Sequence, residues 1–211
     1  SNRLGPKTLV GSAGAISWDL EYNGHEAPVL LLPPKMYAGG FPKAKSLVPL
    51  PLARYRGNYT VAGQRVEVED WIGSQNHNWG SRHTERYAFG QVAGFDDAPD
   101  TFLEVATVQA RVVGPIMTPE LTTLVLRHDG ADYALVAARR AVRAKARYGY
   151  FHWDFATGDE RVRITGRISA DRSAFVGLSY NNPPGGVKYC LNTKIGAAEL
   201  TVRNRETGRT E

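Results

Sequence analysis

The chain has 211 residues, of which 42% are hydrophobic, and its 26 Lys and Arg against 21 Asp and Glu give a net charge of +5. This length is enough for one large all-β domain, or for two small domains, with a genuine hydrophobic core. The positive charge is spread along the chain without an RNA-binding or helix-turn-helix signature, and apolar runs stay below about 18 residues, so we expect neither a nucleic-acid partner nor a membrane span.

Alternating apolar and polar residues predict strands in the first part of the chain. Residues 14–22 have this period of two, and so do residues 54–61 and 64–71, which flank the turn-forming pair Ala62–Gly63. Residues 33–53 are rich in proline, which predicts an extended, loop-like connection. The candidates in this connection for the mouth of a cavity are Met36, Tyr37 and Phe41.

Residues 70–90 have the most unusual composition, because Trp, His, Asn, Glu and Tyr are concentrated there. A strand places every second side chain on one face, and we expect this parity to continue past Gly80. The side chains of that face are Gln75, His77, Trp79, His83, Glu85, Tyr87, Phe89 and Gln91. Ligand pockets combine apolar walls with a few polar groups, so this mixture predicts a pocket wall. The alternative is a Trp-anchored turn whose His and Asn side chains satisfy the neighbouring backbone.

Two long strands are predicted after this stretch. The first covers His83–Phe95, and the chain returns over Thr101–Val113. Glu104 lies on a face of the second strand that is otherwise apolar, which is unusual for a carboxylate. We therefore expect Glu104 to have a special role, or to pair with an arginine, or to face solvent.

The second half of the chain contains more short strands. Asp129–Gly130 predicts a hairpin between Leu121–His128 and Tyr133–Ala138, and Arg139–Arg147 has the composition of a short helix. The parity of the apolar side chains flips around Gly196, which predicts a β-bulge. About a dozen strands with almost no helix indicate an antiparallel all-β barrel or sandwich.

Several chemistries are excluded by missing motifs. The sequence has no Gly-x-Ser-x-Gly elbow, no P-loop and no Gly-x-Gly-x-x-Gly, so nucleotide-dependent and α/β-hydrolase chemistry are not expected. Cys190 is the single cysteine, which rules out an intramolecular disulfide and a cysteine-based zinc site. A lone thiol fits a reducing compartment, and we expect a cytoplasmic location.

Glu104 is a candidate general acid. If its face points into a dry cavity, burial should raise the pKa of the carboxyl, which would then hold a proton near neutral pH. Such an acid can protonate an alkene, and nearby aromatic faces can stabilise the carbocation that forms. A metal bound by His77, His83 and Glu85 is an alternative, but their spacing matches no established motif, so we expect no metal.

A family resemblance rests on residues 73–80, Gly-Ser-Gln-Asn-His-Asn-Trp-Gly, followed by His83 and Tyr87. This segment resembles the His-x-Trp-Gly motif of the hydroxyneurosporene synthase (carotenoid 1,2-hydratase) and AttH-like family. That family is related to tocopherol-cyclase-like proteins and belongs to the calycin, or lipocalin-like, superfamily. The strand around Ser17–Leu20 and the segment Asn192–Lys194 are also similar.

The resemblance implies an antiparallel lipocalin-like β-barrel, with one full barrel and part of a second. Residues 1–115 would form the region that carries the motif, and residues 116–211 a second region that packs on the barrel or completes it. The cavity would bind a hydrophobic, isoprenoid- or lipid-like molecule without a cofactor. Glu104 would donate a proton for hydration or cyclisation, and His77 would be its hydrogen-bond partner or proton relay. The ligand-binding residues would be Gln75, Trp79, His83, Glu85, Tyr87 and Phe89.

Two other functions fit the same residues. The first is a non-catalytic carrier, in which the cavity only binds its ligand. The second is a structural domain of a larger two-barrel protein, in which a further segment completes the site. The sequence leaves the ligand and the oligomeric state open.

Overall fold

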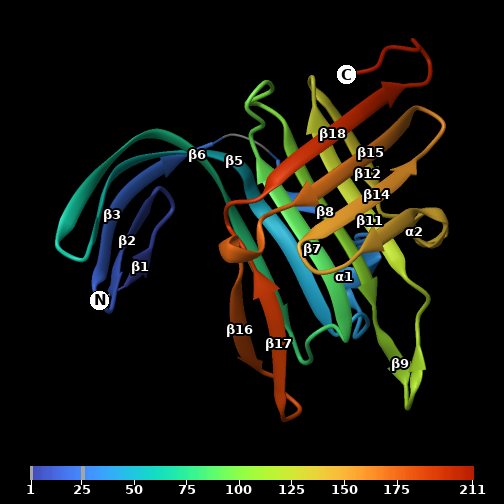
Figure 1. Ribbon diagram of the computed structural model, residues 1–211, viewed down its shortest axis with the longest axis horizontal. Coiled ribbons are helices and arrows are strands. Elements are labelled where there is room, and N and C mark those ends of the chain that lie inside the picture. Colours follow the sequence, from blue (N-terminus) through green and yellow to red (C-terminus); the bar gives the residue numbers. More distant parts are fainter. Residues whose placement is uncertain (1, 25–26) are drawn as a thin grey trace. The chain divides into compact units, whose positions relative to one another are not determined.

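The computed structural model describes residues 2–24 and 27–211, which form antiparallel β-sheets with little helix (Figure 1). The described residues divide into two compact units, each built from separate segments of the chain. Unit 1 comprises residues 1–29, 47–77 and 93–102, and unit 2 comprises residues 30–46, 78–92 and 103–211. The predicted regions 1–115 and 116–211 are each one continuous stretch of the chain, unlike these units. That division into domains stays a prediction.

The first sheet has six strands in the order β1-β2-β3-β5-β4, and β6 also pairs with β5. Its strands are β1 (Arg3–Leu4), β2 (Thr8–Ala13), β3 (Ile16–Asn23), β4 (Val29–Leu30), β5 (Ala44–Val61) and β6 (Gln64–Gly80). The β5–β6 hairpin was predicted, and its turn residues Ala62 and Gly63 both have positive φ, 49° and 80°. This turn geometry follows the right-handed twist of the two strands that it joins.

The strands of this hairpin are longer than the sequence predicted. Residues 44–53 belong to β5, although they contain Pro49 and Pro51 and were expected to be part of a loop. Proline fixes φ at a value that an extended strand accepts and removes only one backbone donor. The proline-rich loop is therefore confined to residues 31–43, which also hold the short helix α1 (Lys35–Ala38).

In unit 2, one four-stranded sheet has the order β12-β11-β8-β7. Its strands are β7 (Arg86–Ala93), β8 (Phe102–Gln109), β11 (Leu121–His128) and β12 (Ala131–Leu135). Side chains of the two central strands are buried on both faces, with Leu103, Val105, Leu124 and Leu126 at most 1% exposed. Burying each such side chain contributes roughly 1.5–3 kcal/mol, so this sheet is the main core of the unit.

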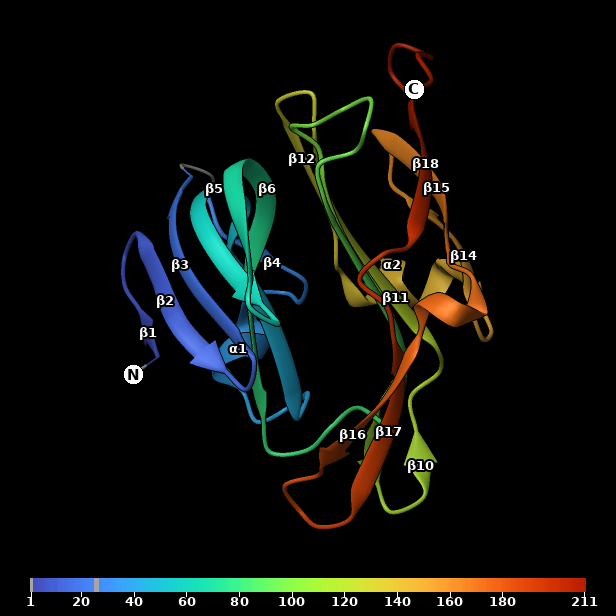
Figure 2. The same cartoon turned by 60° about the vertical axis from the view of Figure 1, so that its left-hand side comes forward.

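A second four-stranded sheet of unit 2 packs against the first. Its strands, in the order β13-β14-β15-β18, are β13 (Lys145–Tyr148), β14 (His152–Gly158), β15 (Val162–Ser169) and β18 (Ala197–Asn204). Figure 2 shows the two sheets as separate layers. At Gly90, a Cβ atom would lie 2.4 Å from Ile168 Cδ1 and 3.3 Å from Trp153 Cζ3, so the absence of a side chain permits this close packing.

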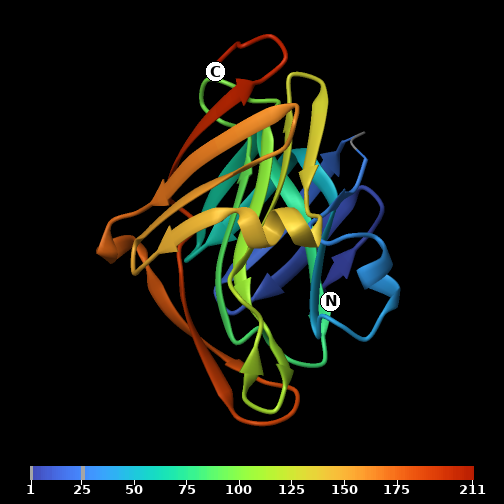
Figure 3. The same cartoon turned by 90° about the vertical axis from the view of Figure 1, so that its right-hand side faces the viewer.

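Short elements complete unit 2. The helix α2 (Ala138–Arg143) lies against β11 and β14 (Figure 3). The remaining elements are the pair β9 (Arg111–Val113) and β10 (Ile116–Met117), the 3₁₀ turn η1 (Arg172–Ala174) and the hairpin β16 (Val176–Asn181) and β17 (Val187–Asn192). The bulge predicted near Gly196 is wrong, because β17 pairs with β16 whereas β18 pairs with β15. The flip in parity marks a change of sheet. No helix among the described residues has the length and apolar character needed to cross a membrane.

Candidate functional site

Glu104 lies in the middle of β8, where the apolar pattern places it. Its side chain is 0% exposed, and its same-face neighbours Phe102 and Ala106 are also buried. β8 is flanked by β7 and β11, so its backbone groups bond within the sheet while both faces of the strand are covered. A fully buried carboxyl group is costly unless it is hydrogen-bonded or serves a function.

A serine at the start of β5 contacts this carboxyl group, and a tyrosine of the proline-rich segment holds that serine. Ser46 Oγ donates a hydrogen bond to Glu104 Oε1 at 3.3 Å. The Tyr37 hydroxyl donates to the carbonyl oxygen of Ser46 at 2.6 Å and accepts from the backbone N–H of Leu32 at 3.3 Å. Burial raises the pKa of Tyr37 above its usual value, the bond from the Leu32 N–H opposes this shift, and electrostatic interaction with Glu104 adds to it. Tyr37 therefore stays a neutral donor across the physiological pH range.

Trp79 forms an aromatic pair with Tyr37. The two ring centroids lie 5.9 Å apart and the planes are tilted by 36°. Gly80 permits the end of β6 to lie close to the backbone before β5, because a Cβ atom there would lie 2.1 Å from the backbone oxygen of Lys43. The same oxygen accepts a hydrogen bond from the backbone N–H of Ser81 at 3.0 Å. The Trp-Gly pair of the motif thus anchors the end of β6 beside the segment that carries Tyr37.

The strand parity that was expected to continue past Gly80 is interrupted, so that prediction is wrong, whereas the pocket wall itself stays a prediction. β6 ends at Gly80 and β7 begins at Arg86, so residues 81–85 form a connection and the parity is interrupted. His77 is exposed, Trp79 is 37% exposed, and Tyr87 and Phe89 are also exposed. The backbone of the connection is held instead by a long-range bond, in which the His83 N–H donates to Asn182 Oδ1 at 3.0 Å.

Gln75 has a local partner in unit 1. Its side chain hydrogen-bonds Tyr55, whose hydroxyl also donates to the backbone oxygen of Ser74 at 3.5 Å. Burial raises the pKa of Tyr55, and the bond with Gln75 opposes that shift. Gln75 therefore positions a tyrosine within its own sheet, and its predicted contact with a ligand stays a prediction.

Glu85 is the centre of a three-residue ion-pair network. Lys188 Nζ donates to its Oε2 at 2.7 Å and Arg111 Nε donates to its Oε1 at 3.0 Å. The hydrogen bond from Arg111 and then that from Lys188 lower the pKa of Glu85 to about 2. Glu85 is therefore ionised and engaged at neutral pH, which gives it a positioning role for β17.

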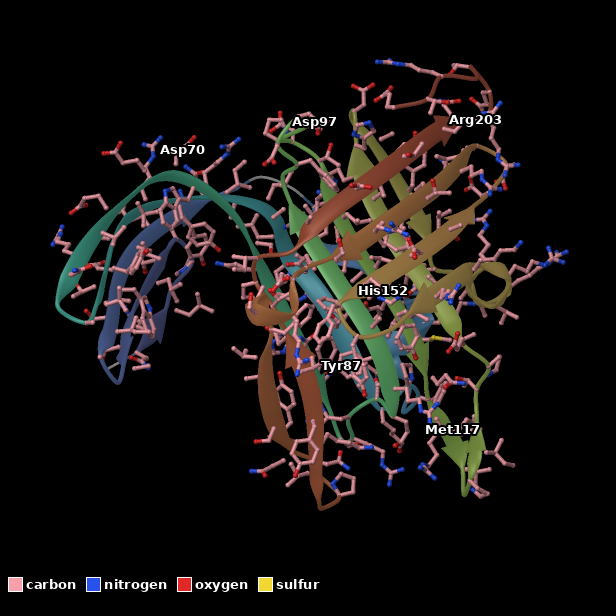
Figure 4. All side chains as sticks on the ribbon, viewed as in Figure 1. Asp70, Tyr87, Asp97, Met117, His152 and Arg203 are labelled. Carbon is pink, nitrogen blue, oxygen red and sulfur yellow. The ribbon has the colours of Figure 1, made fainter. Side chains whose placement is uncertain are left out.

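His83 and Tyr87 also contact the β16–β17 hairpin. The ring of His83 lies 5.4 Å from that of Tyr180, and the Tyr87 hydroxyl hydrogen-bonds the Cys190 side chain. Burial and then this bond raise the pKa of Tyr87. Figure 4 shows Tyr87 beside the hairpin. In residues 2–24 and 27–211, no group of three or more His, Cys, Asp or Glu is placed to hold a metal ion.

Ser46 was missed by the sequence analysis, and Tyr37 was only a candidate for the mouth of a cavity. Both lie far from Glu104 along the chain, with 58 residues separating Ser46 from it. Nothing in the local pattern of a serine between Lys45 and Leu47 indicates a buried partner. The aromatic ring of Tyr37 in a proline-rich segment was the one available signal.

The sequence matches no known protein family and no curated protein. The structure is similar to kievitone hydratase from Nectria haematococca, with a TM-score of 0.53 and 11% sequence identity. The match covers 92% of this chain and 63% of that chain, so this chain spans less than two thirds of its length. At this identity the likeness shows the fold, and it confirms the predicted all-β, lipocalin-like fold class. It supports the family resemblance as a hydratase-like fold relationship.

Proposed function

We propose that this protein binds a hydrophobic small molecule beside Tyr37 and Trp79 and that Glu104 donates a proton to it. The observation that carries the proposal is the buried carboxyl group of Glu104, hydrogen-bonded by Ser46 next to an aromatic pair. A sheet selected for stability alone would place an apolar side chain at this position, because a buried polar group has to be satisfied. Binding pockets, in contrast, combine apolar surface with a few placed polar groups.

The proposed chemistry is acid-catalysed hydration or cyclisation. Glu104 would transfer its proton to one carbon of an alkene, and the other carbon would become a cation. The faces of Trp79 and Tyr37 would stabilise this cation through their π electrons. Addition of water and loss of a proton to the Glu104 carboxylate would complete hydration and restore the acid. The cycle consumes one water molecule and needs no cofactor.

Ser46 and Tyr37 would position the acid. Ser46 Oγ donates to Oε1 of Glu104, and Tyr37 holds the backbone of Ser46 in place. This bond fixes the orientation of the carboxyl group relative to the aromatic pair. The roles of His77 as proton relay and of Tyr87, Phe89, His83, Glu85 and Gln75 in ligand binding remain predictions.

The likeness in fold supports hydration as the reaction to test first. Kievitone hydratase is, by its name, an enzyme that hydrates kievitone. Kievitone and open-chain isoprenoid polyenes are therefore suitable first substrates, and addition of water is detected by mass spectrometry. The single Cys190 supports a reducing compartment such as the cytoplasm as the place where this reaction occurs.

The test is the isosteric substitution Glu104→Gln, which removes the proton and keeps the shape. We expect turnover to fall by about 10²–10⁴-fold, the usual contribution of a general acid, while ligand affinity is retained. Glu69→Gln is the matched control, because Glu69 is exposed on β6 and should leave turnover unchanged. Equal turnover by the Glu104→Gln and unsubstituted proteins would refute the catalytic role. Binding without turnover in both proteins would identify a carrier.

A further inference from the structure

An aromatic hollow in unit 2 shares no residue with the Glu104 site. Its volume is about 430 Å³, and its lining residues are Tyr150, Phe151, Arg172, Phe175 and Leu191. This volume lies in the range of small-molecule pockets, which is about 300–1,000 Å³. Four of these side chains are aromatic or aliphatic and one is cationic, so the hollow can recognise both an apolar ring and a negative charge.

The backbone at Phe151 is strained. Its φ angle is +72°, a left-handed value that bulky residues rarely adopt. The conformation is held by a hydrogen bond from the Ala170 N–H to the Phe151 oxygen at 3.1 Å. It places the Phe151 ring 5.1 Å from that of Phe175 and 6.0 Å from that of Tyr150. Strain of this kind concentrates at ligand-binding sites, where the geometry of a side chain matters more than local stability.

Arg172 provides the charge at this hollow. The neighbouring carboxylate of Asp171 is engaged by its own turn, because it accepts hydrogen bonds from Ser173 N at 2.8 Å and from Ser173 Oγ at 2.6 Å. Within the described part of the chain, no side chain forms an ion pair with Arg172. A guanidinium group beside aromatic rings is therefore available to an external anion.

We propose that this hollow binds a small aromatic carboxylate. The aromatic ring would lie against Phe151 and Phe175, and the carboxylate would accept two parallel hydrogen bonds from Arg172. Leu191 would cover an apolar edge of the ring. A neutral arene would leave the guanidinium unused, and an inorganic anion would leave the rings unused, so a ligand with both groups is the best match.

The test is calorimetric titration of the full chain with 1-naphthoate as the probe, alongside 1-naphthalenemethanol, which has the same ring system without the charge. We expect Arg172→Gln to weaken naphthoate binding by about tenfold or more, because a charge-assisted bidentate contact is lost. Arg163→Gln removes the same charge from an exposed position on β15 and should change affinity by less than about twofold. The alcohol should bind weakly and equally to all three proteins.

A second variant tests the aromatic part of the site. Phe175→Ala should weaken the binding of naphthoate and of the alcohol together, whereas Arg172→Gln affects only the anion. Glu104→Gln should leave naphthoate binding unchanged, which separates this site from the proposed catalytic one. The proposal is overturned if naphthoate does not bind the unsubstituted protein, or if Arg172→Gln and Arg163→Gln reduce its affinity equally.

Discussion

Glu104 and Phe151 are the two residues whose local chemistry departs most clearly from what stability requires. Glu104 is a carboxyl group in the centre of a buried strand, and Phe151 is a bulky residue with left-handed backbone. Both are tolerated because neighbours hold them, Ser46 in the first case and Ala170 in the second. Costs of this kind are expected at functional positions, where the surrounding fold offsets them.

The strain at Phe151 can be measured by comparing two truncations. Phe151→Gly and Phe151→Ala both lose the ring, but only alanine keeps the Cβ atom that disfavours a φ of +72°. We expect the glycine variant to be more stable by about 1 kcal/mol in chemical denaturation. At Tyr150, which is 77% exposed and lacks positive φ, the order should reverse. Greater stability of alanine at position 151 would contradict this account.

At the scale of elements, the β16–β17 hairpin depends on contacts with the connection before β7. It forms a separate two-stranded sheet, and such a sheet is only marginally stable by itself. The ion pair between Glu85 and Lys188 and the bond between Tyr87 and Cys190 join it to the rest of unit 2. Glu85 and Tyr87, which were predicted to line a pocket, therefore hold the hairpin in place.

This attachment should be sensitive to acid. The pKa of Glu85 is lowered from 4.5 to about 2, so its stabilising contribution is complete above about pH 4.5 and is lost as the pH falls towards 2. We expect amide hydrogen exchange in β17 to accelerate over that interval. Glu85→Gln should remove this pH dependence. A double-mutant cycle with Lys188→Gln should give a coupling of about 0.2–1 kcal/mol, and a coupling of zero would rule out the ion pair as the anchor.

At the scale of the whole molecule, the chain has an all-β fold similar to that of kievitone hydratase and a net charge of +5. Each unit builds its sheets from segments that are distant in sequence. A fold of this kind hosts many functions, so the ligand has to be identified from the protein itself.

The proposed binding function predicts that a ligand stays bound to the native protein during purification. We expect solvent extraction and mass spectrometry to find a hydrophobic molecule of isoprenoid or lipid type. Trp79→Ala should lower the recovered amount several-fold, because it removes half of the aromatic pair with Tyr37. Trp71→Ala is the control, since Trp71 is 50% exposed and contacts Tyr59 in unit 1. Equal recovery from both variants, or none from the unsubstituted protein, would count against the binding site.

The sequence by itself determined the local features of this protein. A period of two located most strands, the pairs Ala62–Gly63 and Asp129–Gly130 located two hairpins, and the apolar pattern placed Glu104 on a buried face. These features follow from the geometry of the backbone and of neighbouring side chains, which a short window of residues contains. The number of predicted strands indicated an all-β class, and the family resemblance narrowed this class to a lipocalin-like fold.

Only the tertiary structure decided which distant segments meet. It brought Ser46 to Glu104, made residues 81–85 a connection, and assigned the parity flip near Gly196 to two different sheets. Strand pairing and two-sided burial depend on residues far apart in the chain, and alternation carries no information about which strands become neighbours. For that reason the buried acid could be predicted from its own strand, whereas its hydrogen-bond partner could not.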